Sequence, residues 1–296
     1  MPAFWHWFVA VLTVLFIVWC VWLVAWSAKQ GPKNVNDDEL VGHKWDGDLE
    51  EWNNPAPKWW LYLYFITVIW GVLFLVAMPG LGTYNGLLGW SSKGQYESEM
   101  ERAAATYEPI YEEFAAMEWD QLAQHEDALS LGASLFASYC TTCHGSDARG
   151  ATGYPNLTDD DWQWGNTEQD IVATITNGRQ AAMPVLAPAL GGDEGVDNMV
   201  KYVKSLSGGQ MDAGAQAAQP LFTAMCSACH GMDGKGNKVF GAPNLTDQTW
   251  LYGGSDAAIR ETILQGRNGV MPAHGDLLGP NRTRILAAYV YSLSQD

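Results

Sequence analysis

The feature that most constrains how this chain folds is a short motif of two cysteines and a histidine that occurs twice. The sequence reads YCTTCHG from Tyr139 and MCSACHG from Met225, so both copies have the form C-x-x-C-H. This spacing is typical of the attachment site of a c-type haem, where two thiols bond to one porphyrin and the adjacent histidine binds the iron. The residues expected to hold two covalent haems are Cys140, Cys143 and His144 in the first copy and Cys226, Cys229 and His230 in the second.

Other uses of paired cysteines fit these motifs less well. A structural zinc site made of two C-x-x-C pairs has little use for a histidine after each pair. A redox-active pair is expected in a βαβ context that this sequence does not show. Zinc and a disulfide stay open as alternatives. The fifth cysteine, Cys20, lies in an apolar run and is expected to be a small hydrophobic side chain.

The residues around the two motifs repeat as well, at offsets of 86 to 88 residues. Two copies are too few for a solenoid, so the pattern predicts a duplicated domain. A chain of about 80 residues buries only a thin core, so each domain is expected to need its haem in order to fold. The matching elements are PNLTD at 155 and 243, NGR at 177 and QGR at 265, MP at 183 and 271, and YVKSLS at 202 and YVYSLS at 289.

Two long apolar segments precede the repeats. Phe4–Trp26 and Trp59–Met78 contain no Asp, Glu, Lys or Arg, and each is long enough to cross a bilayer core of about 30 Å. Of the 15 tryptophans, 11 lie in the first 90 residues, a bias that suits a membrane interface. We predict two transmembrane helices. A cleaved signal peptide stays open as an alternative for the first apolar segment. That segment, however, has no positively charged n-region, and its apolar run is longer than the h-region of a signal peptide.

The lysines between the apolar segments predict the orientation in the membrane. Lys29, Lys33, Lys44 and Lys58 lie in this loop, and no Lys or Arg precedes the first segment. The positive-inside rule therefore places the loop in the cytoplasm. Covalent haem attachment, which takes place outside the bacterial cytoplasm, agrees with this. We expect a two-pass protein of the bacterial inner membrane, with its N-terminus and haem domains on the periplasmic side.

The chain is acidic, with 33 Asp and Glu against 16 Lys and Arg and a net charge of −17. Nucleic acid is excluded as a partner because phosphates attract basic surfaces. From Pro79 onward there are 26 acids and 12 bases, so a negative face is expected to attract a basic protein partner.

Together these patterns predict a mainly α chain. The acids of the segment that joins the membrane anchor to the haem domains are expected to form a solvated helix face, and Pro109 is expected to break that helix. The predicted parts are a membrane anchor at 1–92 (helices at about 4–26 and 59–78, cytoplasmic loop 27–58), a helical arm at 93–128, a first haem domain at 129–208, a linker at 209–218 and a second haem domain at 219–296.

The ligand on the other face of each iron decides whether a site can bind small molecules or only exchange electrons. Met183 lies 39 residues after His144 and Met271 lies 41 residues after His230, and a proline follows each methionine. We expect Met183 to close the first haem site and Met271 the second. The alternative is that both fill gaps beside the haem. His274, three residues after Met271, is the rival ligand at the second iron.

The chain resembles the di-haem subunit of bacterial cbb3-type cytochrome c oxidases over nearly its whole length. Its repeats, CTTCH…PNL…MP and CSACH…PNL…MP, are similar to class I cytochromes c, a likeness that identifies only a cytochrome. The segment VGHKWDGDLEEWNNPAPKWW at 41–60, followed by an apolar span and MPGLGTYNGLLGWSS at 78–92, is more specific. His43 lies in that segment, where the resemblance implies contacts with other subunits. The family commonly has one membrane helix, so the segment Phe4–Trp26 departs from its pattern.

The resemblance to class I cytochromes implies further contacts to each haem. The proline carbonyl of PNL would accept a hydrogen bond from Nδ1 of the proximal histidine and fix its ring. An arginine just before each methionine loop is a candidate to pair with a haem propionate; the alternative is a plain surface arginine. The residues concerned are Pro155 and Pro243 for the prolines and Arg179 and Arg267 for the arginines.

The resemblance implies a membrane-anchored electron carrier that makes and breaks no substrate bonds itself. Single electrons would pass from a donor cytochrome c, through both haems, to a mono-haem cytochrome c subunit and the catalytic haem–copper oxidase subunit. One rival is an anchored di-haem carrier that serves another dehydrogenase or reductase, which the haem motifs do not exclude. A second is a di-haem peroxidase, which needs an iron open to peroxide and is disfavoured by two Met-Pro loops.

Overall fold

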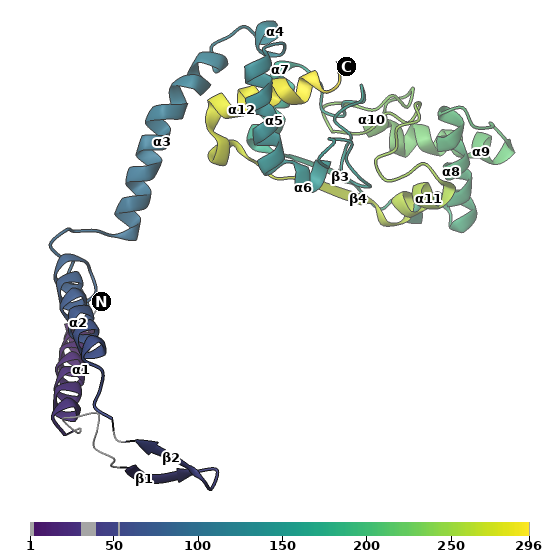
Figure 1. Ribbon diagram of the computed structural model, residues 1–296. Helices are drawn as coiled ribbons and strands as arrows, with labels where there is room; N and C mark the ends of the chain where they lie inside the picture. The colour runs from purple at the N-terminus through teal and green to yellow at the C-terminus, as the bar shows by residue number, and fades with distance from the viewer. Residues whose placement is uncertain (1–2, 31–39, 53, 296) are drawn as a thin grey trace. The chain divides into compact units, whose positions relative to one another are not determined.

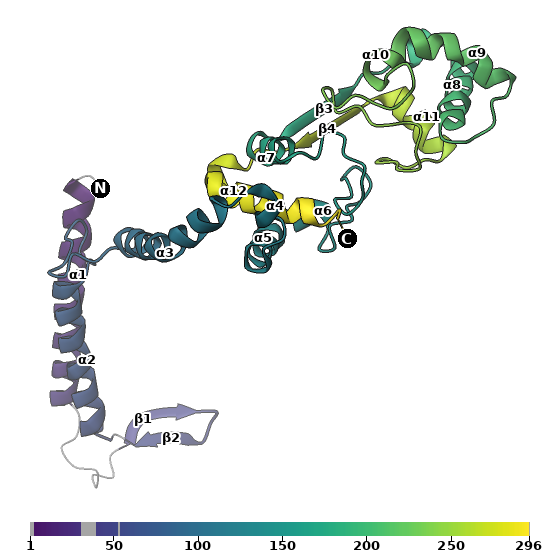
Figure 2. The same ribbon diagram turned by 90° about the horizontal axis from the view of Figure 1, so that it is seen from above.

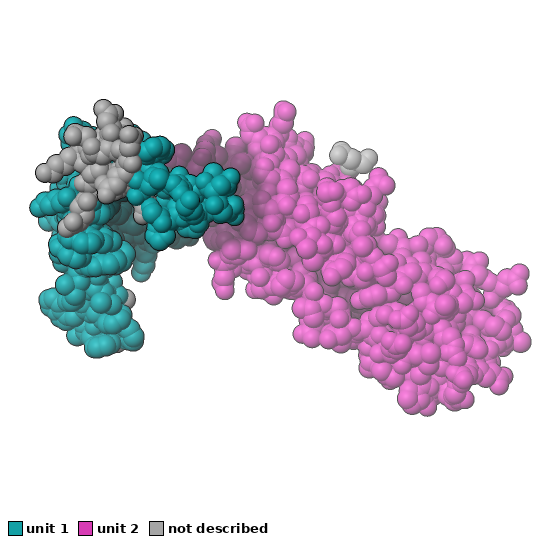
Figure 3. Space-filling view, turned by 60° about the horizontal axis from the view of Figure 1, so that its bottom comes forward, with its two compact units in different colours: residues 1–104 teal, residues 105–296 magenta. Residues whose placement is uncertain are grey.

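A computed structural model describes residues 3–30, 40–52 and 54–295. These residues fall into two compact units, 1–104 and 105–296, which Figure 3 colours separately. Helices make up most of both units, so the predicted mainly α character is confirmed.

Two long apolar helices dominate the first unit. α1 covers Ala3–Gln30 and α2 covers Lys58–Ala77, and they run side by side (Figures 1 and 2). Both are long and apolar enough to cross a membrane, and none of their described side chains is buried against protein. Apolar side chains that no protein core covers are those that lipid can cover. The helices coincide closely with the predicted segments Phe4–Trp26 and Trp59–Met78.

The loop after α2 is tied to the beginning of α1. The main-chain N–H of Thr83 donates to Nδ1 of His6 at 2.9 Å. Gly82 has a φ of 63°, and a Cβ at this position would overlap the imidazole of His6. Only glycine therefore allows this close approach of the loop to α1.

The segment between α1 and α2 contains a β-hairpin that was not expected from the sequence. β1 (Leu40–Trp45) and β2 (Leu49–Trp52) pair antiparallel. Asp46 and Gly47 both have positive φ in the three-residue turn between the paired Trp45 and Leu49, so the Asp-Gly pair was the available hairpin signal. Lys33, one of the four lysines that predict the orientation, lies outside the described residues.

The arm differs from its prediction in two ways. α3 (Ser92–Ala115) continues through Pro109, so the predicted break is wrong: a proline removes one main-chain hydrogen bond, and the turns around it hold. The end of the arm is also not free. Tyr111 at the end of α3 and Leu122 of α4 (Trp119–Leu122) pack against α12, the last helix of the chain.

The second unit contains two helical cores joined by a two-stranded sheet. We name them the Cys140 core and the Cys226 core, after the motif cysteine that packs against each. The elements, in chain order, are α5 (Glu126–Tyr139), α6 (Thr141–His144), α7 (Glu168–Asn177), β3 (Arg179–Met183), the 3₁₀ helix η1 (Ala187–Leu190), α8 (Asp193–Leu206), α9 (Ala213–Leu221), the π-helix η2 (Phe222–Cys226), α10 (Ser227–His230), α11 (Asp256–Gln265), β4 (Arg267–Met271) and α12 (Gly275–Ser292), which is kinked at Gly279.

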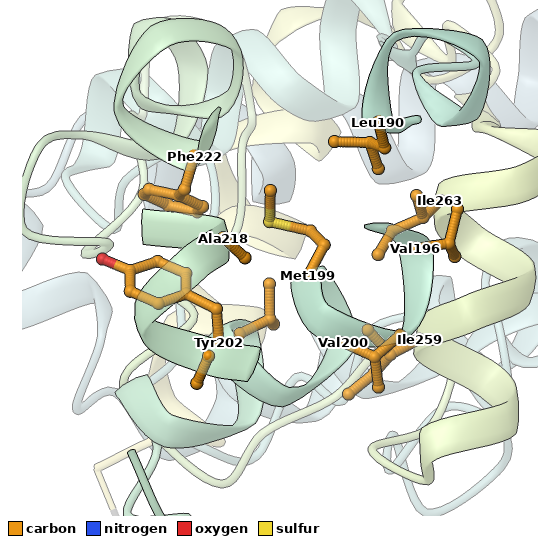
Figure 4. Packing of buried hydrophobic residues seen from close by; sticks show 11 residues of the cluster. Leu190, Val196, Met199, Val200, Tyr202, Ala218, Phe222, Ile259 and Ile263 are labelled. Atoms are coloured by element: carbon orange, nitrogen blue, oxygen red, sulfur yellow. The ribbon is translucent and has the colours of Figure 1, made fainter. Parts of the chain in front are cut away.

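The two cores exchange their last helices. α12, from the second repeat, packs on α5 and α7 in the Cys140 core, while α8, from the first repeat, packs on α9 and α11 in the Cys226 core. Figure 4 shows Met199 of α8 at the centre of the Cys226 core, between Phe222 and Ile263. The core members are Leu135, Phe136, Ala148, Ile171, Ile175, Leu278, Leu286, Ala287 and Val290 for Cys140, and Leu190, Val196, Met199, Val200, Tyr202, Val203, Ala215, Ala218, Phe222, Ile259 and Ile263 for Cys226.

One matched aromatic pair marks each exchanged helix. The ring centres of Phe136 on α5 and Tyr289 on α12 lie 5.7 Å apart. In the other core, the ring centres of Phe222 on η2 and Tyr202 on α8 lie 5.1 Å apart. The predicted domains at 129–208 and 219–296 are thus the sequence repeats, whereas each packed core takes its last helix from the other repeat.

Part of the predicted linker at 209–218 is helical. Residues 213–218 belong to α9, whose first turn is capped by the Asp212 carboxylate, and Ala215 and Ala218 are buried against α8. The small residues that suggest a flexible linker here allow two helices to approach closely.

The sheet joins the two cores. β3 and β4 are antiparallel, and their register pairs Arg179 with Met271, Ala181 with Gly269, and Met183 with Arg267. The chain therefore leaves the Cys140 core along β3 and returns to it along β4.

Candidate functional site

Both C-x-x-C-H motifs form a helical turn that faces one cavity. In the first, the main-chain N–H of His144 donates to the carbonyl of Cys140 at 3.0 Å. Residues at i, i+3 and i+4 of a helix share a face, so both thiols and the imidazole of a motif lie on the same side. None of the four motif cysteines is paired in a disulfide with another described residue. The cavity has a volume of about 690 Å³, and its lining includes Cys140, Cys143, His144, Cys226, Cys229 and His230.

A proline carbonyl orients each motif histidine. Nδ1 of His144 lies 3.1 Å from the carbonyl oxygen of Pro155, and Nδ1 of His230 lies 3.1 Å from that of Pro243. An N–H at Nδ1 that donates to a carbonyl leaves a lone pair on Nε2, the form in which histidine binds iron. Burial lowers the pKa of both imidazoles and so favours the neutral ring, although the proline hydrogen bond acts in the opposite sense.

Glycine allows the loop after each motif to fold back beneath its histidine. Gly150 and Gly236 have φ values of 67° and 81°, and a Cβ at either position would overlap the main chain of the returning loop. These residues bring the prolines within reach of the histidines.

The alternative uses of the cysteines gain no support. Burial, together with Cys143, raises the pKa of the Cys140 thiol to about 11, and burial also raises that of Cys226. A redox-active pair needs a lowered thiol pKa. In the described part of the chain, no three His, Cys, Asp or Glu side chains are grouped as zinc ligands would be.

Arg179 is held on the cavity wall from two sides. Its Nε donates to Oγ1 of Thr174 at 2.8 Å, and its guanidinium lies 4.8 Å from the centre of the Trp164 ring. The sequence predicts the arginines as site residues but not these partners, although the threonine and the aromatic ring recur at the same offset in both repeats. The corresponding residues of the second site are Arg267, Thr262 at 2.9 Å and Tyr252 at 4.5 Å.

Trp162, also missed from the sequence, supplies a donor without a protein acceptor. Its ring lines the cavity, and its buried Nε1–H has no hydrogen-bond partner among the described residues. A buried N–H that stays unpaired costs about 1–3 kcal/mol, so an acceptor is expected in the cavity. A haem propionate is such an acceptor. Paired thiols, neutral imidazoles, arginines and an unpaired indole N–H together fit a haem c.

The two methionines expected as sixth ligands line the same cavity but differ from the expected placement. Met183, expected above His144, packs against the Cys226 core, and Met271, expected above His230, packs against the Cys140 core. The physical reason is that β3 and β4 are extended strands that cross from one core to the other.

The same crossing moves His274, the predicted rival ligand at the second iron. Its main-chain N–H donates to the carbonyl of Ile175 in α7 at 2.9 Å, and its charge contributes to lowering the pKa of His144. His274 therefore lies on the Cys140 side. His43 lies on β1 and is exposed.

Comparisons with known proteins match almost the whole chain. The family model for the N-terminal domain of cytochrome oxidase-cbb3, FixP, matches residues 37–85, and that for cytochrome c oxidase, cbb3-type, subunit III, matches residues 127–203 and 213–290. A cbb3-type cytochrome c oxidase subunit CcoP from Rubrivivax gelatinosus is 43% identical over 292 residues, which are 98% of this chain and 95% of the relative. Subunit FixP from Azorhizobium caulinodans is 39% identical, with 86% and 92% covered, and subunit CcoP from Cereibacter sphaeroides is 36% identical, with 90% and 98% covered.

Proposed function

The chain belongs to the CcoP and FixP family of cbb3-type cytochrome c oxidase subunits, and on this premise we propose that it conducts single electrons through two covalent c-type haems. It is a cytochrome c component of an enzyme complex of the respiratory chain. In the proposal its own role is non-catalytic, since the chemistry with oxygen takes place on another subunit.

The observation that carries the proposal is the repeated geometry of thiols, histidine and proline. In both repeats the two thiols of C-x-x-C line the cavity, and the histidine is held at 3.1 Å by a proline carbonyl. Two independent copies of one arrangement support two haems per chain.

A bound haem c would supply a one-electron couple between Fe(III) and Fe(II). The cysteines would hold the porphyrin as thioethers, and Nε2 of each histidine would be the proximal ligand. The guanidinium groups of Arg179 and Arg267 would form charge-assisted hydrogen bonds with haem propionates, and the indole N–H of Trp162 would donate a further hydrogen bond to a propionate. These contacts would balance the negative charge of the propionates inside the cavity. A thioether from a methionine would close the remaining face of each iron and leave the site able only to exchange electrons.

The partners follow from the membrane anchor and the charge. We propose that α1 and α2 both cross the bacterial inner membrane, with the N-terminus and haem cores on the periplasmic side and the hairpin in the cytoplasm. The anchor keeps the haems close to a mono-haem subunit and to the haem–copper subunit. The acidic haem unit would attract a basic donor cytochrome c, so the rate of reduction should fall as salt rises.

The test is to purify the intact complex from membranes and to measure its cofactors. The expected result is two c-type haems for each copy of this chain, together with b-type haem and copper from its partners. One haem or none on this chain would overturn the proposal. Isolation without copper and b-type haem would favour a carrier for another enzyme, and binding of carbon monoxide or peroxide to the native haems would favour a peroxidase.

A further inference from the structure

We propose that α3 binds an α-helix of another subunit of the oxidase complex, through a row of exposed apolar side chains that is bordered by glutamates. The partner helix is expected to carry apolar residues on one face and Lys or Arg beside that face. This inference goes beyond the proposed function and does not depend on how many haems the chain holds. We name the row the α3 stripe, and its residues are Tyr96, Met100, Ala103, Tyr107 and Ile110.

The spacing of the α3 stripe is that of a coiled coil. Its residues follow one another at intervals of four, three, four and three positions. This alternation repeats every seven residues, so the side chains form one row along the helix, into which a second helix can pack. Ala103 is the smallest member and stands in the middle of the row, where it leaves space for a large apolar side chain of the partner.

The α3 stripe is exposed although most of its side chains are large. Its four large members are between 40% and 61% exposed, and no residue of α3 is buried. In the described part of the chain, none of the five residues belongs to a hydrophobic core or packs against one. Single exposed apolar residues need no explanation, but a regular row over about four helical turns indicates a binding surface.

The α3 stripe continues into a contact that the chain makes with itself. Phe114, four residues after Ile110, packs against buried residues of α4, α5 and α12. Arg282 of α12 lies 4.5 Å from the centre of the Tyr111 ring and pairs with Glu108. The end of α3 is therefore fixed, and the stripe extends the same apolar face beyond the part that the chain itself covers.

The charges beside the α3 stripe decide what kind of helix it can bind. In the seven-residue repeat, Glu97, Glu99 and Glu113 occupy positions that border the row, and no Lys or Arg occupies such a position. Lys93 pairs with Glu97 at 3.6 Å, but both side chains are exposed and such a pair is weak.

These glutamates disfavour two other occupants. A second copy of this chain would bring the same acids face to face, and a membrane surface with anionic lipids would repel them. In a coiled coil, opposite charges at the bordering positions select the partner. A helix bordered by Lys or Arg is therefore the matching occupant.

The opposite face of α3 is polar and supplies the controls. Ser98, Glu101 and Glu112 lie there and are exposed. Ala105 lies on the same polar face, two residues after Ala103 and so about 200° around the helix. The two alanines allow one substitution to be compared on both faces at the same cost in helix propensity.

Photo-cross-linking in the native complex identifies the occupant. A benzophenone amino acid in place of Met100 reacts with C–H bonds in contact with it, and the same amino acid in place of Ala105 is the control. At Met100 we expect one main cross-link, to a helix of another subunit, and mass spectrometry should locate it beside Lys or Arg. A cross-link from Met100 to a second copy of this chain, to lipid or to the haem unit of the same chain would overturn the proposal. Equal yields at both positions, or no cross-link at Met100, would overturn it as well.

A matched pair of substitutions tests whether the α3 stripe contributes to binding. Ala103→Glu places a carboxylate in the row, and Ala105→Glu places one on the polar face. The complex would be purified in detergent through a tag on this chain, and the amount of the cross-linked subunit per chain would be measured. Ala103→Glu should lower that ratio at least about threefold, and Ala105→Glu should leave it at the wild-type value. Equal ratios in the two variants would contradict the proposal.

A second pair tests the bordering charge. Glu99→Lys should lower the same ratio by about twofold, whereas Glu101→Lys, on the polar face, should leave it unchanged. A partner that is retained better in Glu99→Lys would be acidic, and the predicted chemistry of the helix would then be wrong.

The same variants separate this inference from the proposed function. Because no residue of α3 is buried, all four variants should keep the wild-type haem content and thermal unfolding temperature. Loss of the partner subunit with unchanged haem content is the expected result for Ala103→Glu. Fewer than two haems in the wild-type chain would overturn the proposed function and leave the result for α3 standing.

Discussion

The two proposed haem sites of this chain are built from the same parts but have different surroundings. Both have a helical C-x-x-C-H turn, a proline acceptor and an arginine held by a threonine and an aromatic ring. The Cys140 side carries an additional layer, because α3 and α4 pack on α12 there. His144 is buried, at 9% exposed, whereas His230 is only partly buried.

The sites also differ in the charges around them. Asp161 lies on the cavity wall of the first site, and the matching residue of the second repeat is the neutral Thr249. His274 adds a second titratable group on the same side. Duplication has thus kept the residues that would hold a haem and changed those that set its electrostatic environment. Similar ligands in different surroundings are a means to give two haems different potentials.

The largest expected effect comes from removing the thioether bonds of one site at a time. Cys140→Ala with Cys143→Ala, and Cys226→Ala with Cys229→Ala, should each reduce the c-type haem per chain by about half, as measured from the pyridine haemochrome spectrum. Because each proposed haem would fill part of a thin core, unfolding of the affected core should also begin at a lower temperature. Full haem content in either double variant would contradict the assignment of that motif.

The next effect concerns the additional layer on the Cys140 side. Arg284 of α12 donates to the carbonyls of Ala115 and Met117 at 2.6 and 2.7 Å and pairs with Glu168 at 2.5 Å. Arg284→Ala leaves these partly buried acceptors unpaired and should cost about 2–3 kcal/mol of unfolding free energy.

The control for Arg284 is on the other core. Arg260 of α11 pairs with the exposed carboxylates of Asp193 and Asp197. Exposed ion pairs of this kind contribute little to stability, so Arg260→Ala should lower the free energy of unfolding by less than about 1 kcal/mol. Denaturant titration of the purified chain would measure both. Equal losses would mean that the arm adds nothing to the Cys140 core.

Much of the site could be predicted from the sequence because its chemistry depends on local spacing. Three residues of C-x-x-C-H lie within one helical turn, and Pro155 follows close enough for its carbonyl to reach His144. The apolar helices follow from composition alone. In each case the signal and the contact lie near one another along the chain.

What the sequence did not predict depends on contacts between distant segments. Phe136 and Tyr289 would fit a core within either repeat or between repeats, because the two copies offer nearly the same partners. The exchange is decided by β3 and β4, whose residues RQAAM and RNGVM show no clear strand pattern. The linker was misjudged for a related reason, since small residues suit both a flexible segment and a close helix contact.

A smaller effect is expected where the exchanged helices cross. A Cβ placed on Gly132 of α5 would lie 2.5 Å from Cβ of Tyr289 on α12, so Gly132→Ala should separate the helices and cost about 1–2 kcal/mol, even though alanine favours helix. At the matching position of the other crossing stands Ala218, which is 2% exposed. Ala218→Gly should cost about 1 kcal/mol through lost helix propensity and packing. Thermal unfolding of both variants would show whether the first crossing is the tighter one, and a stabilising Gly132→Ala would contradict it.

The smallest effect is a dependence on pH that only the first site should show. Burial, followed by the nearby Asp247 and Asp159, raises the pKa of the Asp161 carboxyl to about 6 from an ordinary value of 3.8. Between these values the folded chain holds a proton that the unfolded chain has lost, so this group's contribution to stability falls as pH rises from about 4 to about 6. The loss should be below about 1 kcal/mol because the group keeps contact with solvent.

Ionisation of Asp161 also places a negative charge on the cavity wall and so favours Fe(III) in the haem beside it. The midpoint potential of the His144 haem should therefore fall as pH rises through about 6, while that of the His230 haem, beside Thr249, should stay level over the same step. Asp161→Asn should remove the pH dependence of the midpoint potential of the His144 haem. Thr249→Asp should introduce a similar pH dependence for the His230 haem. Redox titration of the complex between pH 5 and 8 would measure both haems at once. If the step in midpoint potential persisted in Asp161→Asn, another group would be responsible for it. His274, which lies on the same side, would then be the first residue to substitute.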